Sequence, residues 1–199
     1  MKFWTSKFLG VFMFGLILGV ILKICVSISL AKRDCESPGW IWGLVPVNGL
    51  LCLWVMNAAG WQAQGLLFCL CTSALLAVAV IDGKTMEIPL KYNLFIGGLG
   101  VLRMFFCLNR WYEYFIGFFA VSSLLLVFFL LTGGEGIGGG DVKLMAAVGL
   151  FLGWEKVLWA FWVGGLVGIM YYILFRGKQL RGKAFALGPF LVAAIIVML

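Results

Sequence analysis

Long apolar runs, separated by short polar stretches, make up most of the chain. Each run approaches the roughly 20 residues that a helix needs to cross the hydrocarbon layer of a membrane. They lie near residues 8–30, 38–58, 62–82, 90–108, 112–132, 141–153, 157–175 and 184–199, and the sixth and the last are short. Because a backbone in lipid must satisfy its own hydrogen bonds, these runs predict helices. We expect an all-α, polytopic membrane bundle of about eight spans.

Composition agrees with this pattern. Of the 199 residues, 64% are hydrophobic and only 12% are charged, about half the charged share of a soluble domain. No polar stretch is long enough for a separate soluble domain, so the interpretation is a single transmembrane domain over residues 1–199. The run from Phe8 to Leu30 exceeds the core of a typical signal peptide, and we expect it to be retained.

Two residue types limit the chemistry. The chain has no histidine, which excludes Ser–His and Cys–His nucleophiles. Its six cysteines form no C-x-x-C pair, and five lie in apolar runs, where cysteine behaves as a small hydrophobe. We therefore expect neither a metal site nor a cofactor.

Two of the three aspartates border apolar runs. Asp82 ends the third run, and Asp141 begins the sixth, directly after Gly138, Gly139 and Gly140. Carboxylates at such borders are costly and are functional candidates. Two spans separate them, so both aspartates lie on the same side of the membrane and can meet.

A close pair of carboxyl groups shares one proton, which suits the hydrolysis of a peptide bond by water. The glycines before Asp141 either let a substrate backbone approach or form a flexible linker, and the adjacent aspartate favours the first interpretation. Glu87 and Glu135 rank below the aspartates as solvated loop acids. Lys143 is two residues beyond Asp141 and is expected to reach the lipid headgroups instead of pairing with that carboxylate.

Positive charge predicts the orientation. Loops that follow odd-numbered spans carry nine Lys and Arg residues, and the opposite side carries four. The positive-inside rule then places both aspartates at the cytoplasmic face. We attribute the net charge of +7 to membrane topology and to contact with anionic lipid. The sequence shows no organised basic surface of the kind that binds nucleic acid.

Three segments resemble known motifs. Asp82 to Pro89 resembles the D-x6-P element of the type IV prepilin peptidases, and Gly138 to Leu144 resembles their G-x-G-D-x-K-L element. Ala186 to Leu191 resembles their phenylalanine–glycine–proline–phenylalanine segment. The similarity covers most of residues 62–199. The chain is thus identified with the GxGD membrane aspartic proteases of the prepilin peptidase type.

The resemblance implies an aspartic endopeptidase of a prokaryotic cell membrane, with Asp82 and Asp141 as the catalytic pair. Such enzymes remove the basic leader of prepilin or pseudopilin precursors at the cytoplasmic face, after a glycine. Many members also carry a cysteine-rich loop after the first span, linked to N-methylation. Here that loop runs from about Ala31 to Pro38 with the single Cys35, which argues against methyltransferase activity.

Two other functions stay open. One is a transporter that couples the acids to protons or cations, since intramembrane acids and broken glycine-rich spans also serve transport. The other is a catalytically silent homologue that acts in pilus or secretion assembly. The sequence does not determine which precursor is the substrate, nor the oligomeric state.

Overall fold

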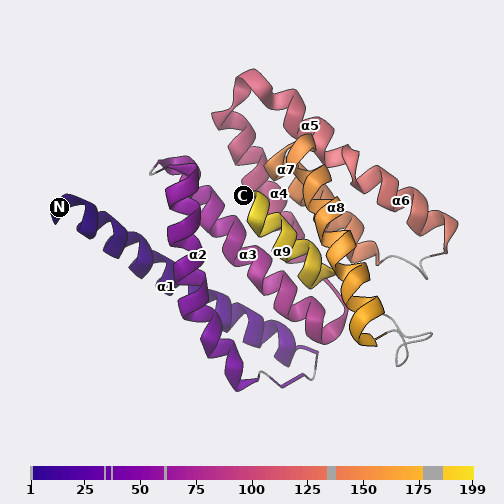
Figure 1. The fold of residues 1–199 in the computed structure, drawn as a ribbon, viewed down its shortest axis with the longest axis horizontal. Helices are drawn as coiled ribbons and strands as arrows, with labels where there is room; N and C mark the ends of the chain where they lie inside the picture. The colour runs from indigo at the N-terminus through magenta and orange to yellow at the C-terminus, as the bar shows by residue number, and fades with distance from the viewer. Residues whose placement is uncertain (1, 34, 37, 61, 134–137, 177–185) are drawn as a thin grey trace. The chain divides into compact units, whose positions relative to one another are not determined.

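The computed structural model describes residues 2–33, 35–36, 38–60, 62–133, 138–176 and 186–199. Every regular element within these ranges is helical (Figure 1). The α-helices are α1 (Lys2–Ala31), α2 (Leu44–Ala59), α3 (Ala63–Thr85), α4 (Leu90–Phe106), α5 (Trp111–Ala120), α6 (Ser122–Leu131), α7 (Gly139–Leu152), α8 (Trp154–Tyr171) and α9 (Gly188–Met198). Short 3₁₀ segments η1 (Gly39–Gly43) and η2 (Leu108–Arg110) and a π-helical turn η3 (Tyr172–Arg176) extend them.

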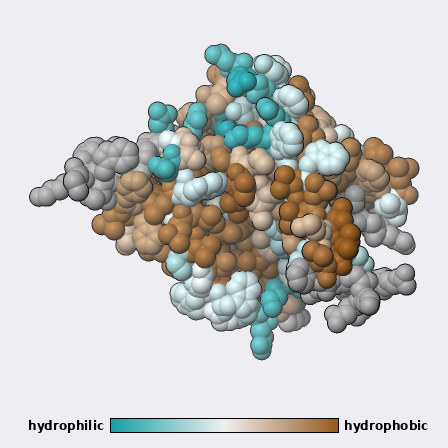
Figure 2. All heavy atoms as spheres, in the orientation of Figure 1, coloured by the Kyte–Doolittle hydropathy of each residue, from teal (hydrophilic) through white to brown (hydrophobic). Residues whose placement is uncertain are grey.

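These helices coincide with the expected spans. The fifth expected span consists of α5 and α6, which meet at Val121, and Pro89 is the N-cap of α4. Hydrophobic side chains cover much of the face drawn in Figure 2. Five segments of the described chain are long and apolar enough to cross a membrane: Phe8–Ala31, Gly39–Ala59, Ala63–Thr85, Leu108–Leu131 and Trp154–Leu174. The prediction of an all-α, multi-pass membrane protein is confirmed.

The chain forms two compact units, and the first comprises residues 1–81 with Leu199. In it, α1 packs on α2 through glycines: a methyl group on Gly15 would meet the Gly49 backbone at 2.8 Å. The buried Asn48 side chain donates to the Gly15 carbonyl at 3.0 Å and accepts from the Ser73 hydroxyl at 3.1 Å. Small residues and polar side chains thus join these helices, as is typical in lipid.

The second unit, Asp82 to Met198, surrounds α7 with α4, α5, α6 and α8. Two glycines let neighbouring backbones approach α7 closely. A methyl group on Gly100 of α4 would lie 2.9 Å from the Leu150 backbone. Gly117 of α5 faces Gly149 so closely that neither position has room for a side chain. The small helix α7 is therefore fixed in place by backbone contacts.

The far end of α7 is held by Arg103 of α4. Its guanidinium donates to the carbonyl of Phe151, one of the last carbonyls of α7, which lack partners within their own helix. The same group lies 5.3 Å from the ring centre of Tyr114 and 5.1 Å from that of Phe151. A cation at a helix C-terminus also offsets the negative end of the helix dipole. Arg103 therefore caps the end of α7 that is opposite Asp141.

Helices α8 and α9 also pack through small residues. A methyl group on Gly164 would lie 3.0 Å from the Leu191 backbone, and one on Gly168 would lie 2.8 Å from the Leu187 side chain. Gly153 has a different role, because its φ of +88° forms the turn between α7 and α8. Few residues other than glycine adopt that conformation.

Gly117→Ala is expected to destabilise the second unit. The added methyl group would lie 2.7 Å from the Gly153 backbone, where α5 cannot retreat without moving α7. Overpacking of this kind costs about 1–3 kcal/mol, which corresponds to a fall of about 2–12 °C in the unfolding midpoint. Thermal unfolding in detergent micelles measures it. Gly98→Ala is the control, because nothing lies within 4 Å of its methyl group; equal midpoints for the two variants would contradict the packing argument.

Candidate active site

Asp82 lies in the last turn of α3 and is only 5% exposed. This is an unfavourable place for a carboxylate, because the last carbonyls of a helix carry partial negative charge. Burial adds a further cost unless the group gains hydrogen bonds. The structure must therefore compensate Asp82 from elsewhere in the chain.

The compensation comes from the start of α9. The backbone N–H of Gly188 donates to Oδ2 of Asp82 at 3.1 Å. Gly188 is the first residue of α9, and the first N–H groups of a helix are unpaired and partially positive. The carboxylate thus caps α9. A methyl group on Gly188 would lie 2.8 Å from Cγ of Asp82, so this position has room only for glycine.

Asp141 occupies the first turn of α7, at its third residue. Gly138 is the N-cap, with extended dihedrals (φ −70°, ψ 134°), and its carbonyl accepts from the Asp141 N–H at 3.0 Å. An acid in the first turn is favoured by the positive end of the helix. At about 1.5 Å per residue, α7 is only about 21 Å long, too short to cross a membrane alone.

The electrostatic surroundings of Asp141 favour its protonated form more than water does. Burial, and then the negative charge of Asp82, raise the pKa of the Asp141 carboxyl to about 6, while a hydrogen bond from the Gly138 backbone acts in the opposite direction. The Asp141 carboxyl group therefore changes between its protonated and ionised forms near pH 6.

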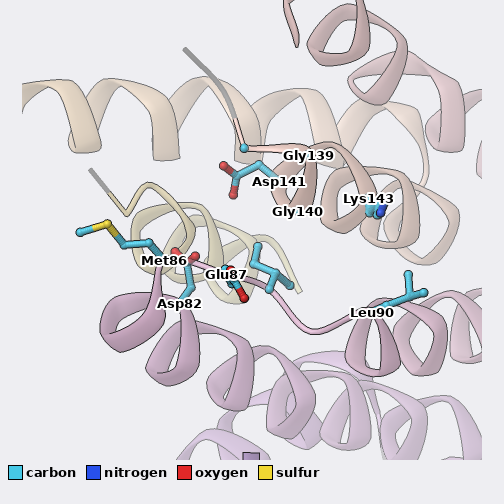
Figure 3. Close-up of a pocket in the computed structure, with 10 residues that line it drawn as sticks. Asp82, Met86, Glu87, Leu90, Gly139, Gly140, Asp141 and Lys143 are labelled. Atoms are coloured by element: carbon cyan, nitrogen blue, oxygen red, sulfur yellow. The ribbon is translucent and has the colours of Figure 1, made fainter. Parts of the chain in front are cut away.

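Both aspartates line one pocket of about 270 Å³. Figure 3 shows their carboxyl groups projecting into the space between the end of α3 and the start of α7. The described lining residues are Asp82, Met86, Glu87, Ile88, Leu90, Gly138, Gly139, Gly140, Asp141 and Lys143. All belong to the second unit.

The loop from α3 to α4 forms one wall of this pocket. Met86 has a φ of +53°, which is uncommon for a side chain other than glycine, and its N–H bonds to the Asp82 carbonyl at 2.8 Å. The chain then has no regular structure up to Pro89, whose own dihedrals are extended. A methyl group on Gly140 would lie only 3.1 Å from Cβ of Ile88, so glycine at this position lets the start of α7 come close to the loop. This contact brings the two acids to opposite sides of one small space.

The structure places Asp82, Asp141 and Gly138–Gly140, the five residues predicted for the site, around the same pocket (Figure 3). Glu87 is exposed and lies on the rim. Lys143 also lines the pocket, although the sequence indicated only contact with lipid headgroups. Glu135 and the glycines within 134–137 are outside the described residues.

Sequence reasoning missed Gly188. The segment around it was noted only for its resemblance to a motif, and no role was assigned to the glycine. The available signal was a glycine followed by proline at the start of an apolar run, which is typical of a helix N-terminus with free N–H groups. That signal does not reveal which acceptor the N–H groups meet.

The arrangement suits water-based hydrolysis. A carboxylate can take a proton from water, and a neighbouring carboxyl group can donate one to a carbonyl oxygen. The pocket is small, and the glycines that line it carry no side chains that would cover the backbone.

Comparison with known proteins gives a consistent family. The sequence model of the type IV leader peptidase family matches residues 69–173, which include both aspartates. Among curated proteins, the chain is similar to the "Prepilin leader peptidase/N-methyltransferase" of Burkholderia pseudomallei, with 34% identity over 182 residues, covering 81% of this chain and 55% of the relative.

Proteins of the same name from two other bacteria are also similar. The one from Pectobacterium carotovorum is 34% identical and covers 70% of this chain and 50% of its own length. The one from Pseudomonas aeruginosa is 31% identical, and the match covers 67% of this chain and 48% of that relative. The chain thus spans about half the length of these curated relatives. No solved structure matches it at a significant level. Since the family match extends over more than half of the chain, the protein belongs to the type IV leader peptidase family.

Proposed function

We propose that the protein is a membrane aspartic endopeptidase that removes the N-terminal leader of prepilin or pseudopilin precursors, with Asp82 and Asp141 as its catalytic pair. The observation that carries this proposal is the pocket between α3 and α7, which both carboxyl groups line. Membership of the leader peptidase family and the printed names of the relatives support the substrate class.

The reaction requires that one of the two aspartates is ionised and the other protonated. The ionised carboxylate takes a proton from water while the water oxygen bonds to the scissile carbonyl carbon. The protonated carboxyl group donates its proton to the carbonyl oxygen, which gives a neutral tetrahedral diol. The C–N bond then breaks as the carbonyl re-forms, and a proton passes to the leaving nitrogen. Water is consumed, and no metal or covalent intermediate is required for this balance.

Gly138, Gly139 and Gly140 have a proposed role in substrate binding. They line the pocket beside Asp141 and carry no side chains, so an extended substrate backbone has room to approach. The charge distribution favours a site at the cytoplasmic face of the cell membrane. The membrane would present the precursor, and anionic lipid would hold the basic loops.

The proposed activity does not include N-methylation. The names of the relatives combine a peptidase with an N-methyltransferase. In this chain the stretch between the first two spans is short and holds a single cysteine, Cys35. We therefore expect a mature substrate whose new N-terminus is unmethylated.

Asp82→Asn and Asp141→Asn are each expected to abolish leader removal. Each change deletes an acid while nearly preserving shape, and one general acid or base contributes about 10²–10⁴-fold to the rate. The measurement is co-expression with tagged candidate precursors, followed by mass spectrometry of the mature N-terminus.

Asp34→Asn, the same change at the remaining aspartate, is the matched control, and this variant should still remove the leader. Processing that survives either change at Asp82 or Asp141 would refute the catalytic pair. If wild type cleaves no precursor, a transporter or a silent assembly factor becomes the better interpretation.

The protonation of Asp141 gives a pH test that is independent of activity. Dicyclohexylcarbodiimide labels protonated carboxyl groups, so labelling of Asp141 should fall as pH rises through its pKa of about 6. Activity that depends on this proton should decline over the same range. In Asp82→Asn the neighbouring negative charge is gone, so the pKa of Asp141 falls and the labelling midpoint moves to lower pH. Mass spectrometry quantifies the label, with Asp141→Asn as the blank; an unchanged midpoint in Asp82→Asn would show that the two groups do not interact.

Gly138→Ala tests the glycine wall. The backbone of Gly138 is ordinary for alanine, but the methyl group would lie 3.3 Å from Oδ2 of Asp141. We expect unchanged thermal stability and a fall of about tenfold in kcat/KM. The comparison is Gly139→Ala, whose methyl group would contact only the Phe129 ring, at 3.6 Å. This variant should lower kcat/KM less than Gly138→Ala does. Equal effects would argue against crowding at the carboxyl group.

A further inference from the structure

Asp82 and Gly188 are 106 residues apart in sequence, yet one hydrogen bond joins them. The donor is a backbone N–H, so no side chain of α9 is needed for the contact. Asp82 also lines the pocket, so the carboxylate that borders the pocket is held by Oδ2 against the start of α9.

The bond also has an electrostatic consequence. Asp82 stands at the negative end of α3, where an ionised carboxylate is disfavoured. The start of α9 supplies a donor and the positive end of an 11-residue helix. Hydrogen bonds to the ionised form stabilise that form. The α9 N-terminus thus offsets the penalty that α3 imposes.

The position of Gly188 is itself fixed by packing. Leu187, directly before it, meets Gly168 of α8, and Leu191, one turn later, meets Gly164. On the other side, Pro189 lies 3.6 Å from where a methyl group on Gly83 would be, next to Asp82. The donor is therefore held rigidly, and a side chain at residue 188 would push the carboxylate away.

We propose that Gly188 is a positioning residue for catalysis: its backbone N–H at the start of α9 fixes Oδ2 of Asp82 and keeps this carboxylate as the ionised, water-activating member of the pair. Asp141 is then the member that donates the proton to the substrate carbonyl. This assignment of roles rests on the proposed peptidase function.

The sharpest test removes the donor without changing the shape. Incorporation of glycolic acid at position 188 during cell-free synthesis into lipid nanodiscs replaces the amide by an ester. The matched control is an ester at Phe190, whose N–H bonds to the Leu187 carbonyl at 3.1 Å in the same turn but does not reach Asp82. Each variant loses one hydrogen bond that a backbone N–H of α9 donates, to the Asp82 carboxylate in the first and to the Leu187 carbonyl in the second.

The ester at 188 should lower kcat by about 10- to 100-fold with little change in KM, since a hydrogen bond to a charged group is lost. The acidic limb of its pH–rate profile should move to higher pH, because the ionised form is less stable. The ester at 190 should keep the profile of wild type. Identical profiles and rates for the two esters would overturn the proposal.

Side-chain variants give a second measurement. Gly188→Ala displaces the Asp82 carboxylate, whereas Gly164→Ala strains the same α8–α9 packing, with its methyl group 3.0 Å from the Leu191 backbone, and leaves Asp82 untouched. We expect both to lower the unfolding midpoint and only Gly188→Ala to change the pH profile. A pH profile shifted equally in both variants would mean that α9 acts through stability alone.

Carbodiimide labelling of Asp82 separates this proposal from the peptidase function. Labelling at neutral pH should rise in the 188 ester and not in the 190 ester, whether or not a precursor is cleaved. If labelling rises but wild type cleaves nothing, the peptidase function is wrong and the positioning contact stands. If wild type cleaves through both aspartates but the two esters label alike, the positioning role is wrong.

Discussion

A buried carboxylate in an apolar protein needs hydrogen-bond donors. The arrangement of the second unit follows largely from how Asp82 obtains one. Burial without a hydrogen bond would cost several kcal/mol or neutralise the acid. The Gly188 N–H satisfies one oxygen, which requires α9 to begin against the end of α3. That requirement explains a glycine at 188 and the close packing of α9 on α8. The positive end of α9 thereby offsets the unfavourable negative end of α3.

Asp141 is positioned by the packing of its helix, α7. Its helix is short, and backbone contacts through Gly100, Gly117 and Gly149 hold it. Arg103 caps the opposite end. In lipid there is little hydrophobic gain from joining apolar helices, so close packing of small residues and internal hydrogen bonds give most of the stability. The same glycines that stabilise α7 therefore also fix the height at which its acid meets the pocket.

The environments of the two aspartates are unlike, which matters for the proposed catalytic pair. Asp82 is nearly fully buried with a backbone donor, whereas Asp141 is half-buried and has its pKa raised toward neutrality. Two carboxyl groups whose surroundings give them different pKa values commonly act as the acid and the base of a reaction. The family match includes both aspartates, and the chain spans about half the length of its curated relatives.

The sequence by itself determined the helical class and the approximate positions of the helices, because apolar runs are local features, and it singled out the two aspartates as candidates because acids at the borders of such runs are costly. Only the tertiary structure decided that Gly188 faces Asp82, that Ile88 meets Gly140, and that Lys143 borders the pocket. These contacts join residues up to 106 positions apart, and a backbone N–H has no side-chain identity by which a sequence pattern can reveal its acceptor.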